Sequence, residues 1–406
     1  MKHALINHSS GNQYVLITSN MYRPSVGGIE NSLYHLAVEY KALGYSPIIV
    51  TSDINDAGII LPEYEVDEDI EIFRYRACTK KGVIGFLKHI NHAIKLYKKI
   101  LKDYQPLTVV CRYHFNLVLL GLAGCKGVLY LIPSIVKNES KISMQQGQTG
   151  LAKIRNNLSF AFHKYLQAKA VKQAKTLYVF SENMRSQVAE LTSRADVYIT
   201  KPGVSLERFY PLTMKEKGLA RQELGLVTQR QVLLCVGRLV KVKGFDTAIR
   251  AIAGAKKKNM ELWLLGDGPL LETFQQLIIE LGCQGQVKLL GRQQAPEKYY
   301  RAADVFVMSS IHEALGQTIL EAMACGLPVI AAPCSENVVT ASHEVLDDDK
   351  NIFTREHSVE AFAESFMQVA EMSAAEYSII SHFNREKAQE RFSWAALAKD
   401  LLSERS

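Results

Sequence analysis

Short apolar runs alternate with longer segments of helical spacing over most of the chain. The first run, Tyr14 to Asn20, has the length of a strand, and apolar residues then recur at helical spacing through Leu33, Leu36 and Tyr40. Further strand-length runs lie at 47–51, 70–74, 108–111, 128–132, 176–180 and 197–200. Strands that alternate with helices are typical of a doubly wound parallel sheet. We therefore expect an α/β fold for the first half of the chain.

A second α/β series begins after a polar stretch. Residues 207–227 are rich in turn formers and lysine, which favours an interdomain linker. Strand-length runs then follow at 232–236, 261–265, 287–290 and 305–308. For a chain of 406 residues this pattern predicts two Rossmann-like domains, residues 1–205 and 206–385. Such domains would face each other across one cleft at the carboxyl ends of their strands.

The segment 309–332 carries much of the candidate chemistry. Its apolar spacing predicts a strand end, a loop, a helix, a turn and another strand. Free N–H groups at the start of such a helix attract anions, and carboxylates that flank the anion are good acceptors for sugar hydroxyls. An ordinary βα unit with two solvated glutamates has the same spacing, so both interpretations stay open. The candidate residues here are Glu313, Leu315, Gly316, Gln317, Thr318 and Glu321.

Glycines and cations elsewhere complete a candidate anion site. Gly27 and Gly28 separate the first strand from its helix, where backbone can approach a ligand closely. Their spacing does not match the dinucleotide fingerprint G-x-G-x-x-G. Arg238 and Lys243 follow the first strand of the second domain, and a guanidinium fork with an ammonium suits a pyrophosphate without a metal. Each feature taken alone is more typical of an ordinary turn or a surface cation, and only their combination favours an anion site.

Composition restricts the class of protein. The seven cysteines contain no C-x2-C pair, which favours reduced core residues and argues against a disulfide or zinc framework. The amino-terminal residues show no signal-peptide core, and no apolar run approaches the roughly 18 residues of a membrane-spanning helix. We therefore expect a cytoplasmic protein.

Charge is uneven along the chain. Residues 1–208 hold 26 Lys and Arg against 16 Asp and Glu, whereas the remainder holds 22 against 25. Lysines repeat every seven residues along one face of an amphipathic helix expected at 80–104, which is either a solvated face or a stripe that docks on an anionic membrane surface. Basic stripes without interleaved aromatic residues argue against nucleic acid as a partner. The lysines of this stripe are Lys81, Lys88, Lys95 and Lys102.

Six motifs in order resemble the retaining glycosyltransferases of family 4, which have the GT-B fold. They are Pro24-x-x-Gly27-Gly28-Ile29-Glu30, Lys201-Pro202-Gly203-Val204, Gly237-Arg238 with Lys243-Gly244, Gly266-Asp267-Gly268-Pro269, Glu313-x7-Glu321, and Glu321 to Val329. The likeness covers residues 14 to about 332. It also extends to Arg391-Phe392-Ser393-Trp394, which resembles the start of a closing helix, at about 386–406, that packs back on the first domain.

The resemblance implies a role for each matched residue. Gly27 and Gly28 would approach the donor diphosphate from the first domain, and Arg238 and Lys243, beside Gly237 and Asp267, would neutralise it from the second. Glu321 would bind the ribose, Glu313 would face the donor sugar, and the backbone of 315–318 would hold sugar and phosphate. Transfer would proceed with retention and without a metal, because stabilising charge on the leaving group is the main contribution of such a site.

The chain departs from the family pattern at three places. Many members carry a histidine after the fifth strand, where this chain has residues 131–134; His114, after the preceding strand, is a catalytic or a structural histidine on this evidence. The glycine-rich loop expected after residue 332 is replaced by Pro333-Cys334-Ser335-Glu336-Asn337, which bears on sugar selectivity. Asp347-Asp348-Asp349 resembles the metal-binding triplet of the other glycosyltransferase fold but lies far beyond the cleft-facing motifs.

These expectations define one main function and two alternatives. The main function is the transfer of a sugar from a nucleotide diphosphate donor, a UDP-sugar, to a saccharide or lipid-linked saccharide in bacterial surface polysaccharide synthesis, by an enzyme that is cytoplasmic or peripheral on the membrane. A GT-B nucleotide-sugar epimerase is one alternative, and it would need further acid-base carboxylates around the sugar. A non-catalytic nucleotide-sugar-binding protein is the other.

Overall fold

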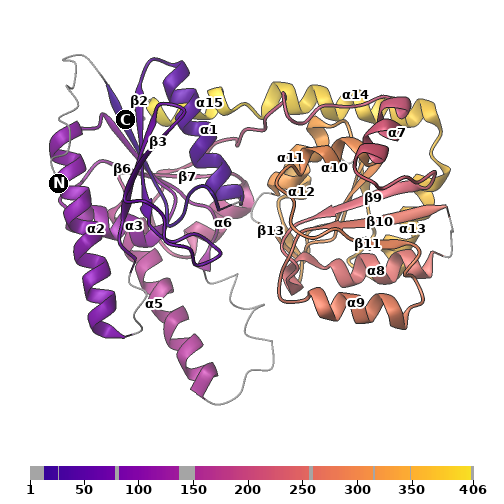
Figure 1. The fold of residues 1–406 in the computed structure, drawn as a ribbon, viewed down its shortest axis with the longest axis horizontal. Coiled ribbons are helices and arrows are strands. Elements are labelled where there is room, and N and C mark those ends of the chain that lie inside the picture. Colours follow the sequence, from indigo (N-terminus) through magenta and orange to yellow (C-terminus); the bar gives the residue numbers. More distant parts are fainter. Residues whose placement is uncertain are drawn as a thin grey trace.

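The chain forms two lobes that lie side by side, with two carboxyl-terminal helices that run along the top, one over each lobe (Figure 1). The computed structural model describes residues 13–25, 27–77, 82–136, 151–255, 259–313, 316–347 and 349–403. In the helix that begins at residue 151, side chains are described from residue 156 onward. The predicted arrangement of two α/β domains is therefore observed, with one sheet in each lobe.

An eight-stranded sheet forms the amino-terminal lobe, in the order β3-β4-β2-β1-β5-β6-β7-β8. The continuous apolar run of β1 is explained by burial on both faces, since Val15, Leu16 and Ile17 are all fully buried. The strands are β1 Tyr14–Thr18, β2 Ser46–Ser52, β3 Tyr64–Asp67, β4 Ile70–Tyr75, β5 Thr108–Cys111, β6 Val128–Leu131, β7 Thr176–Val179 and β8 Val197–Ile199. The helices are α1 Gly28–Ala42, α2 Val83–Tyr104, α3 His114–Leu122, α5 Leu151–Gln173 and α6 Glu182–Ala189.

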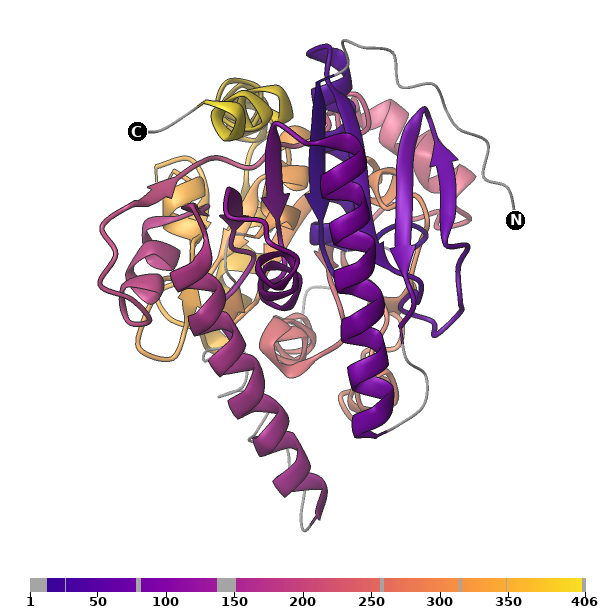
Figure 2. The same cartoon turned by 90° about the vertical axis from the view of Figure 1, so that its left-hand side faces the viewer.

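One strand of this sheet departs from the predicted parallel arrangement. The edge strand β3 pairs antiparallel with β4, whereas the other pairs are parallel. The sequence of β3 alternates exposed and half-buried positions and has no apolar run, so apolar periodicity did not predict it. Seen from the side of this lobe, α2 and α5 extend well past the end of the sheet (Figure 2).

The carboxyl-terminal lobe is built on a six-stranded parallel sheet, in the order β11-β10-β9-β12-β14-β16, with a two-stranded pair, β13 and β15, beside it. Its strands are β9 Gln231–Val236, β10 Met260–Leu265, β11 Val287–Leu289, β12 Val305–Met308, β13 His312–Glu313, β14 Val329–Ala331, β15 Val339–Thr340 and β16 Ile352–Phe353. Its helices are α7 Met214–Glu223, the 3-10 turn η1 Lys241–Lys243, α8 Phe245–Gly254, α9 Leu271–Glu280, α10 Glu297–Ala302, α11 Gln317–Ala324, α12 Ser342–Val345 and α13 Val359–Glu371.

The prediction that residues 207–227 form a linker was wrong. This stretch contains α7, which begins at a capping box between Thr213 and Glu216. Two of its cations are buried against the carboxylate of Asp304 before β12: Arg221 at 2.7 Å and Lys217 at 3.5 Å. Buried charges are tolerated only when they are paired, so α7 belongs to the core of the second lobe.

The closing helix consists of two helices. The first, α14 (Ala374–Arg391), packs on α11 in the second lobe, and α15 (Trp394–Leu402) packs on α1 in the first lobe. The predicted helix at about 386–406 is therefore interrupted between Arg391 and Trp394. A side-chain carbon at Gly203 would collide with the Trp394 ring, so only glycine lets the two segments that connect the lobes approach this closely. The ring of His35 on α1 stacks on the ring of Trp394, with 5.0 Å between ring centroids.

Trp394→Ala should lower the stability of the protein by about 3 kcal/mol, because a buried aromatic side chain is replaced by a cavity. Urea unfolding followed by circular dichroism measures the loss. Ile379→Ala on the neighbouring α14 is the control, since Ile379 is 59% exposed and its truncation should leave the midpoint unchanged. Equal midpoints for the two variants would contradict the role assigned to Trp394.

Candidate active site

Two loops at the carboxyl ends of β9 and β10 form the base of the site in the second lobe. The backbone N–H of Leu239 donates to the carbonyl of Asp267 at 2.9 Å. A side-chain carbon at Gly266 would collide with the carbonyl oxygen of Gly237, so the two loops lie backbone against backbone. Arg238 and Asp267 are exposed on these loops. Within the described ranges, no carboxylate lies within ion-pair distance of the Arg238 guanidinium.

Lys243 and Glu313 form an ion pair between Nζ and Oε2. Both side chains are mostly buried, at 18% and 20% exposed. Hydrogen bonds hold the two loops together, from Ile311 N–H to the Val242 carbonyl at 2.9 Å and from Ser309 Oγ to the Lys243 carbonyl at 2.9 Å. The structure therefore brings these two predicted catalytic residues into contact, and Glu313 is the counterion of Lys243.

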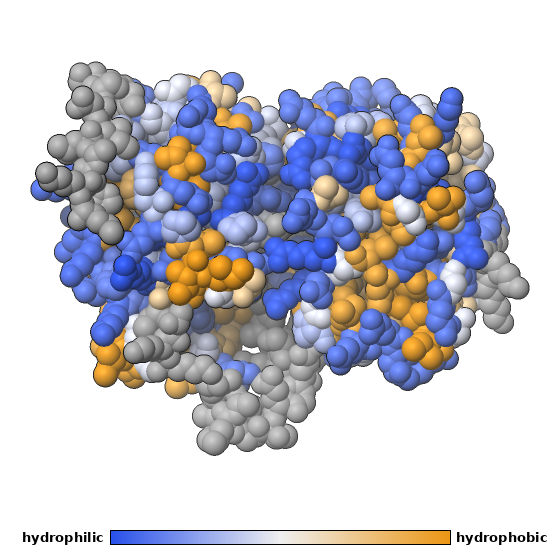
Figure 3. Space-filling view, in the orientation of Figure 1, coloured by the Kyte–Doolittle hydropathy of each residue, from blue (hydrophilic) through white to orange (hydrophobic). Residues whose placement is uncertain are grey.

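The amino end of α11 faces the other lobe. Its first residue, Gln317, donates from Nε2 to the carbonyl of Gly203 at 2.9 Å. A side-chain carbon at Gly28 would lie 4.0 Å from Cβ of Gln317. The predicted glycine turn of the first lobe and the predicted anion-binding helix of the second are thus adjacent. The hollow between the lobes is bordered by largely hydrophilic surface (Figure 3).

The segment between the two candidate carboxylates is not one helix. Glu313 belongs to β13, and α11 begins only after Gly316, its N-cap residue. Thr318 is in the first turn of α11, with a buried hydroxyl that has no hydrogen-bond partner within the described ranges. Leu315, also predicted to bind substrate, lies outside the described residues.

Glu321 has an unusual environment for a carboxyl group. Burial raises its pKa to about 7, and Glu297 adds to this effect. The nearby Tyr300 hydroxyl and Arg208 guanidinium act in the opposite direction. A carboxyl group with this pKa changes charge near neutral pH, so it can accept hydrogen bonds from hydroxyls as a carboxylate or donate one as an acid.

His114 lies at the first residue of α3 and is buried. Its Nε2 is 3.0 Å from Nδ1 of His163 on α5, so one ring nitrogen donates to the other. Burial, together with His163, lowers the pKa of His114 to about 4, which keeps the imidazole neutral at pH 7. The ring contacts recorded for His114 in the described part of the chain come from the first lobe, through Tyr113 and His163.

Two polar bridges between the lobes were not predicted from the sequence. Arg292, after β11, pairs with Asp56 of the first lobe at 2.6 Å. On the opposite side, the carboxylate of Glu344 accepts the backbone N–H groups of Glu182 and Asn183, at 2.6 and 2.9 Å, at the amino end of α6. The position of Arg292 directly after a strand was a usable signal for the first bridge. We find no sequence signal for the second.

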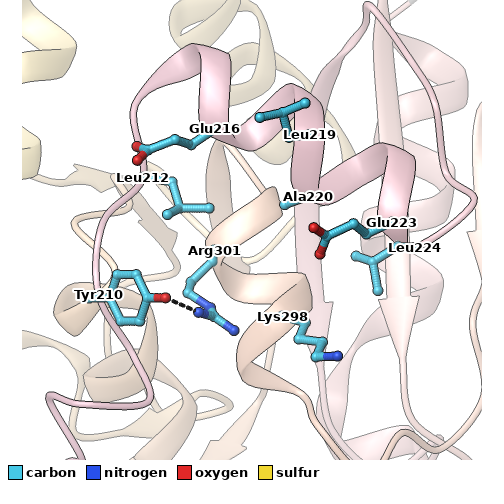
Figure 4. Close-up of a pocket in the computed structure, with 9 residues that line it drawn as sticks. All are labelled: Tyr210, Leu212, Glu216, Leu219, Ala220, Glu223, Leu224, Lys298 and Arg301. Carbon is cyan, nitrogen blue, oxygen red and sulfur yellow. Dashed lines mark hydrogen bonds between the residues drawn. The ribbon is translucent and has the colours of Figure 1, made fainter.

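A separate pocket of about 250 Å³ lies between α7 and α10, away from these residues (Figure 4). It is lined by none of the candidate site residues, and two of its polar groups have partners within the lobe: Glu216 is in the capping box of α7, and the Arg301 guanidinium donates to the Tyr210 hydroxyl. The pocket therefore adds no residue to the candidate site.

Among the residues that the structure describes, no group of three or more His, Cys, Asp or Glu side chains is placed to hold a metal ion. Of the acidic triplet, Asp348 lies outside the described residues, and Asp347 pairs with Lys387 at 3.6 Å. Metal independence stays a prediction.

Known glycosyltransferases match parts of the chain. Residues 216–386 match the family model described as "Glycosyl transferases group 1". Over 111 residues the chain is 41% identical to the lipopolysaccharide core biosynthesis glycosyltransferase LpsE of Rhizobium meliloti, in an alignment that covers 27% of this chain and 32% of that protein. The chain spans between about a third and just over half of the length of the first curated relatives that it matches.

Solved structures resemble the whole chain. Sucrose-phosphate synthase from Thermosynechococcus elongatus superposes with a TM-score of 0.77 at 19% identity, over 96% of this chain and 97% of that one. HepE from Anabaena, in complex with UDP and glucose, superposes with a TM-score of 0.72 at 17% identity, over 95% and 97%. The GT-B fold and the resemblance to glycosyltransferases are confirmed. The assignment to family 4 stays a prediction.

Glu321→Gln should stabilise the protein at pH 8 and have a smaller effect at pH 5. The pKa of Glu321 is raised from 4.5 to about 7 in the folded state, so ionisation of this group opposes folding. That penalty is fully present above the folded pKa and disappears as the pH falls to the unfolded value. Urea midpoints of both proteins at the two pH values measure the difference, and an equal difference at both would contradict the burial effect.

Proposed function

We propose that this chain transfers a hexosyl group from a UDP-sugar to a saccharide or lipid-linked saccharide, with retention and without a metal. The chain has the GT-B fold, and residues 216–386 match the group 1 glycosyltransferase model. One relative is a lipopolysaccharide core biosynthesis glycosyltransferase, and HepE was solved with UDP and glucose. These names support the acceptor class and the donor.

One observation carries the proposal: Gly28 of the first lobe lies against Gln317, at the amino end of α11, in the second. Arg238 and Lys243 lie on the β9 loop of the same lobe, and Lys243 is tied through Glu313 to the segment that leads into α11. Bare backbone, helix N–H groups, the paired Lys243 and the exposed Arg238 offer the groups that a diphosphate site needs.

The chemistry then follows from charge on the leaving group. As the bond between the anomeric carbon and the phosphate oxygen breaks, Arg238 and Lys243 stabilise the negative charge that develops on the diphosphate. The acceptor hydroxyl attacks on the same face, and its proton passes to the departing phosphate oxygen. Glu321 binds the ribose hydroxyls and Glu313 orients the sugar, because both offer carboxyl oxygens beside the anion position. His114, neutral at pH 7, would act as a hydrogen-bonding group and not as an acid.

Glu313→Ala should lower turnover at least a hundredfold, because the carboxylate that orients the sugar is lost. The affinity for UDP should stay unchanged or become slightly tighter, because the substitution frees Lys243 for the diphosphate. A panel of nucleotide sugars, assayed for hydrolysis and for thermal stabilisation, requires no acceptor and identifies the donor first. Glu280→Ala, the same substitution at an exposed glutamate at the end of α9, serves as the control. Unchanged turnover in Glu313→Ala would contradict the catalytic assignment.

We further propose that the first lobe docks on an anionic membrane surface. Lys88, Lys95 and Lys102 are exposed on α2, while Lys81 lies outside the described residues. Exposed apolar side chains gather at the protruding ends of α2 and α5, and a contact between Phe86 and Phe162, with 5.8 Å between ring centroids, joins the two groups. These side chains are Val83, Ile84 and Leu87 on α2 and Leu158, Phe162 and Tyr165 on α5.

A membrane interface accounts for both features, because apolar side chains enter the headgroup region while lysines bind anionic lipids. Apolar surface is visible at the lower edge of the same lobe (Figure 3). No helix in the described ranges is both long and apolar enough to cross a bilayer, so any attachment through them is peripheral.

Lys88→Glu with Lys95→Glu should abolish flotation with vesicles that contain phosphatidylglycerol, whereas Ile84→Ser with Leu87→Ser should weaken it several-fold. The matched control is Lys126→Glu with Lys175→Glu, which makes the same charge change at exposed positions at the other end of the sheet. Equal flotation of the α2 variants and the control would refute membrane docking by this surface.

A further inference from the structure

The amino end of α1 is filled by a carboxylate of the same helix. Gly27, the N-cap residue, has no side chain to accept the free N–H groups of the first turn. Glu30 takes this role, since its carboxylate accepts its own backbone N–H. The carboxylate also lies against the glycine turn, because a side-chain carbon at Gly27 would collide with Oε2 of Glu30.

In the second lobe, too, a carboxylate of the chain engages a group of the candidate site. There the cation assigned to the diphosphate, Lys243, is paired with Glu313. Gly28, next to Gly27, lies close to Gln317 of the second lobe. In each lobe, a carboxylate of the chain itself therefore contacts a group that, in the proposed function, binds the diphosphate.

Charged groups from three other elements face Glu30. Arg112, after β5, and Arg292, after β11, favour its ionised form, whereas Asp56, in the loop after β2, opposes it. Arg112 is 4% exposed, and its guanidinium donates to Ser32 Oγ. Its Nε has no hydrogen-bond partner within the described residues, so a buried donor is available behind the first turn of α1.

We propose that Glu30 is a placeholder: its carboxylate holds the anion position of the first lobe until the diphosphate of the donor displaces it toward Arg112. This inference rests on the proposed function and deepens it. Glu30 is not a catalytic residue, because its carboxylate leaves the anion position when the donor binds. The donor must therefore compete with one negative charge of the chain in order to reach Gly27.

Glu30→Gln removes that charge and keeps the shape of the side chain. Isothermal titration calorimetry with UDP-glucose, whose phosphate diesters do not titrate between about pH 5 and 8, should give about tenfold tighter binding to the variant at pH 8. The ratio of the two affinities should become smaller as the pH is lowered from 8 to 5, because burial raises the pKa of Glu30 above its ordinary value and the wild-type carboxylate takes up a proton more readily. The ratio cancels the titration of Glu321, which is common to both proteins.

Glu39→Gln, nine residues further along α1, is the matched control and should bind like the wild type. Equal or weaker binding by Glu30→Gln at pH 8, or a ratio independent of pH, would overturn the inference and leave the proposed function standing. Failure of all three proteins to bind UDP-glucose would overturn the proposed donor and the inference with it.

Discussion

The site depends on the apolar crossing in which the chain passes twice between the lobes. Gly203 on the outward passage lies under the ring of Trp394 on the return, and Val204 N–H donates to the carbonyl of Phe392 at 3.1 Å. Because the carbonyl of Gly203 also accepts the side chain of Gln317, this packing sets where α11 begins relative to the first lobe. The glycine turn and the amino end of α11 stay adjacent only if the crossing holds the lobes at this distance.

The sequence predicted those parts of the fold that local periodicity determines. The buried strands gave continuous apolar runs, and their observed bounds differ from the expected ones by a residue or two at most positions. The helix α7 was missed because its composition is that of a loop, and only the distant Asp304 explains why Lys217 and Arg221 are buried. A pairing across more than 80 residues leaves no local trace, although the capping box at Thr213 was a readable signal.

The same distinction applies to the site. Glycines and cations after strands were predictable, because ligands of α/β sheets meet the carboxyl ends of strands and such positions can be read from the chain. Which carboxylate pairs with which cation was not predictable, because side-chain rotation decides it. Glu313 was expected to face a sugar, yet it pairs with Lys243. His163, the partner of His114, lies 49 residues further on and had no motif to mark it.

The contacts between the lobes are unequal in strength, and the weaker polar bridges break more easily than the apolar crossing. The bridge of Asp56 to Arg292 is an exposed ion pair, and such pairs contribute about 0–1 kcal/mol. The second bridge is polar as well, with Glu344 accepting two backbone N–H groups at the amino end of α6. The crossing buries Trp394 and Phe392, and burial of large apolar side chains contributes about 1.5–3 kcal/mol each. Salt weakens the bridges and leaves the crossing intact. A ligand that enters between the lobes therefore exchanges one set of weak ionic contacts for another, while the crossing keeps the glycine turn opposite α11.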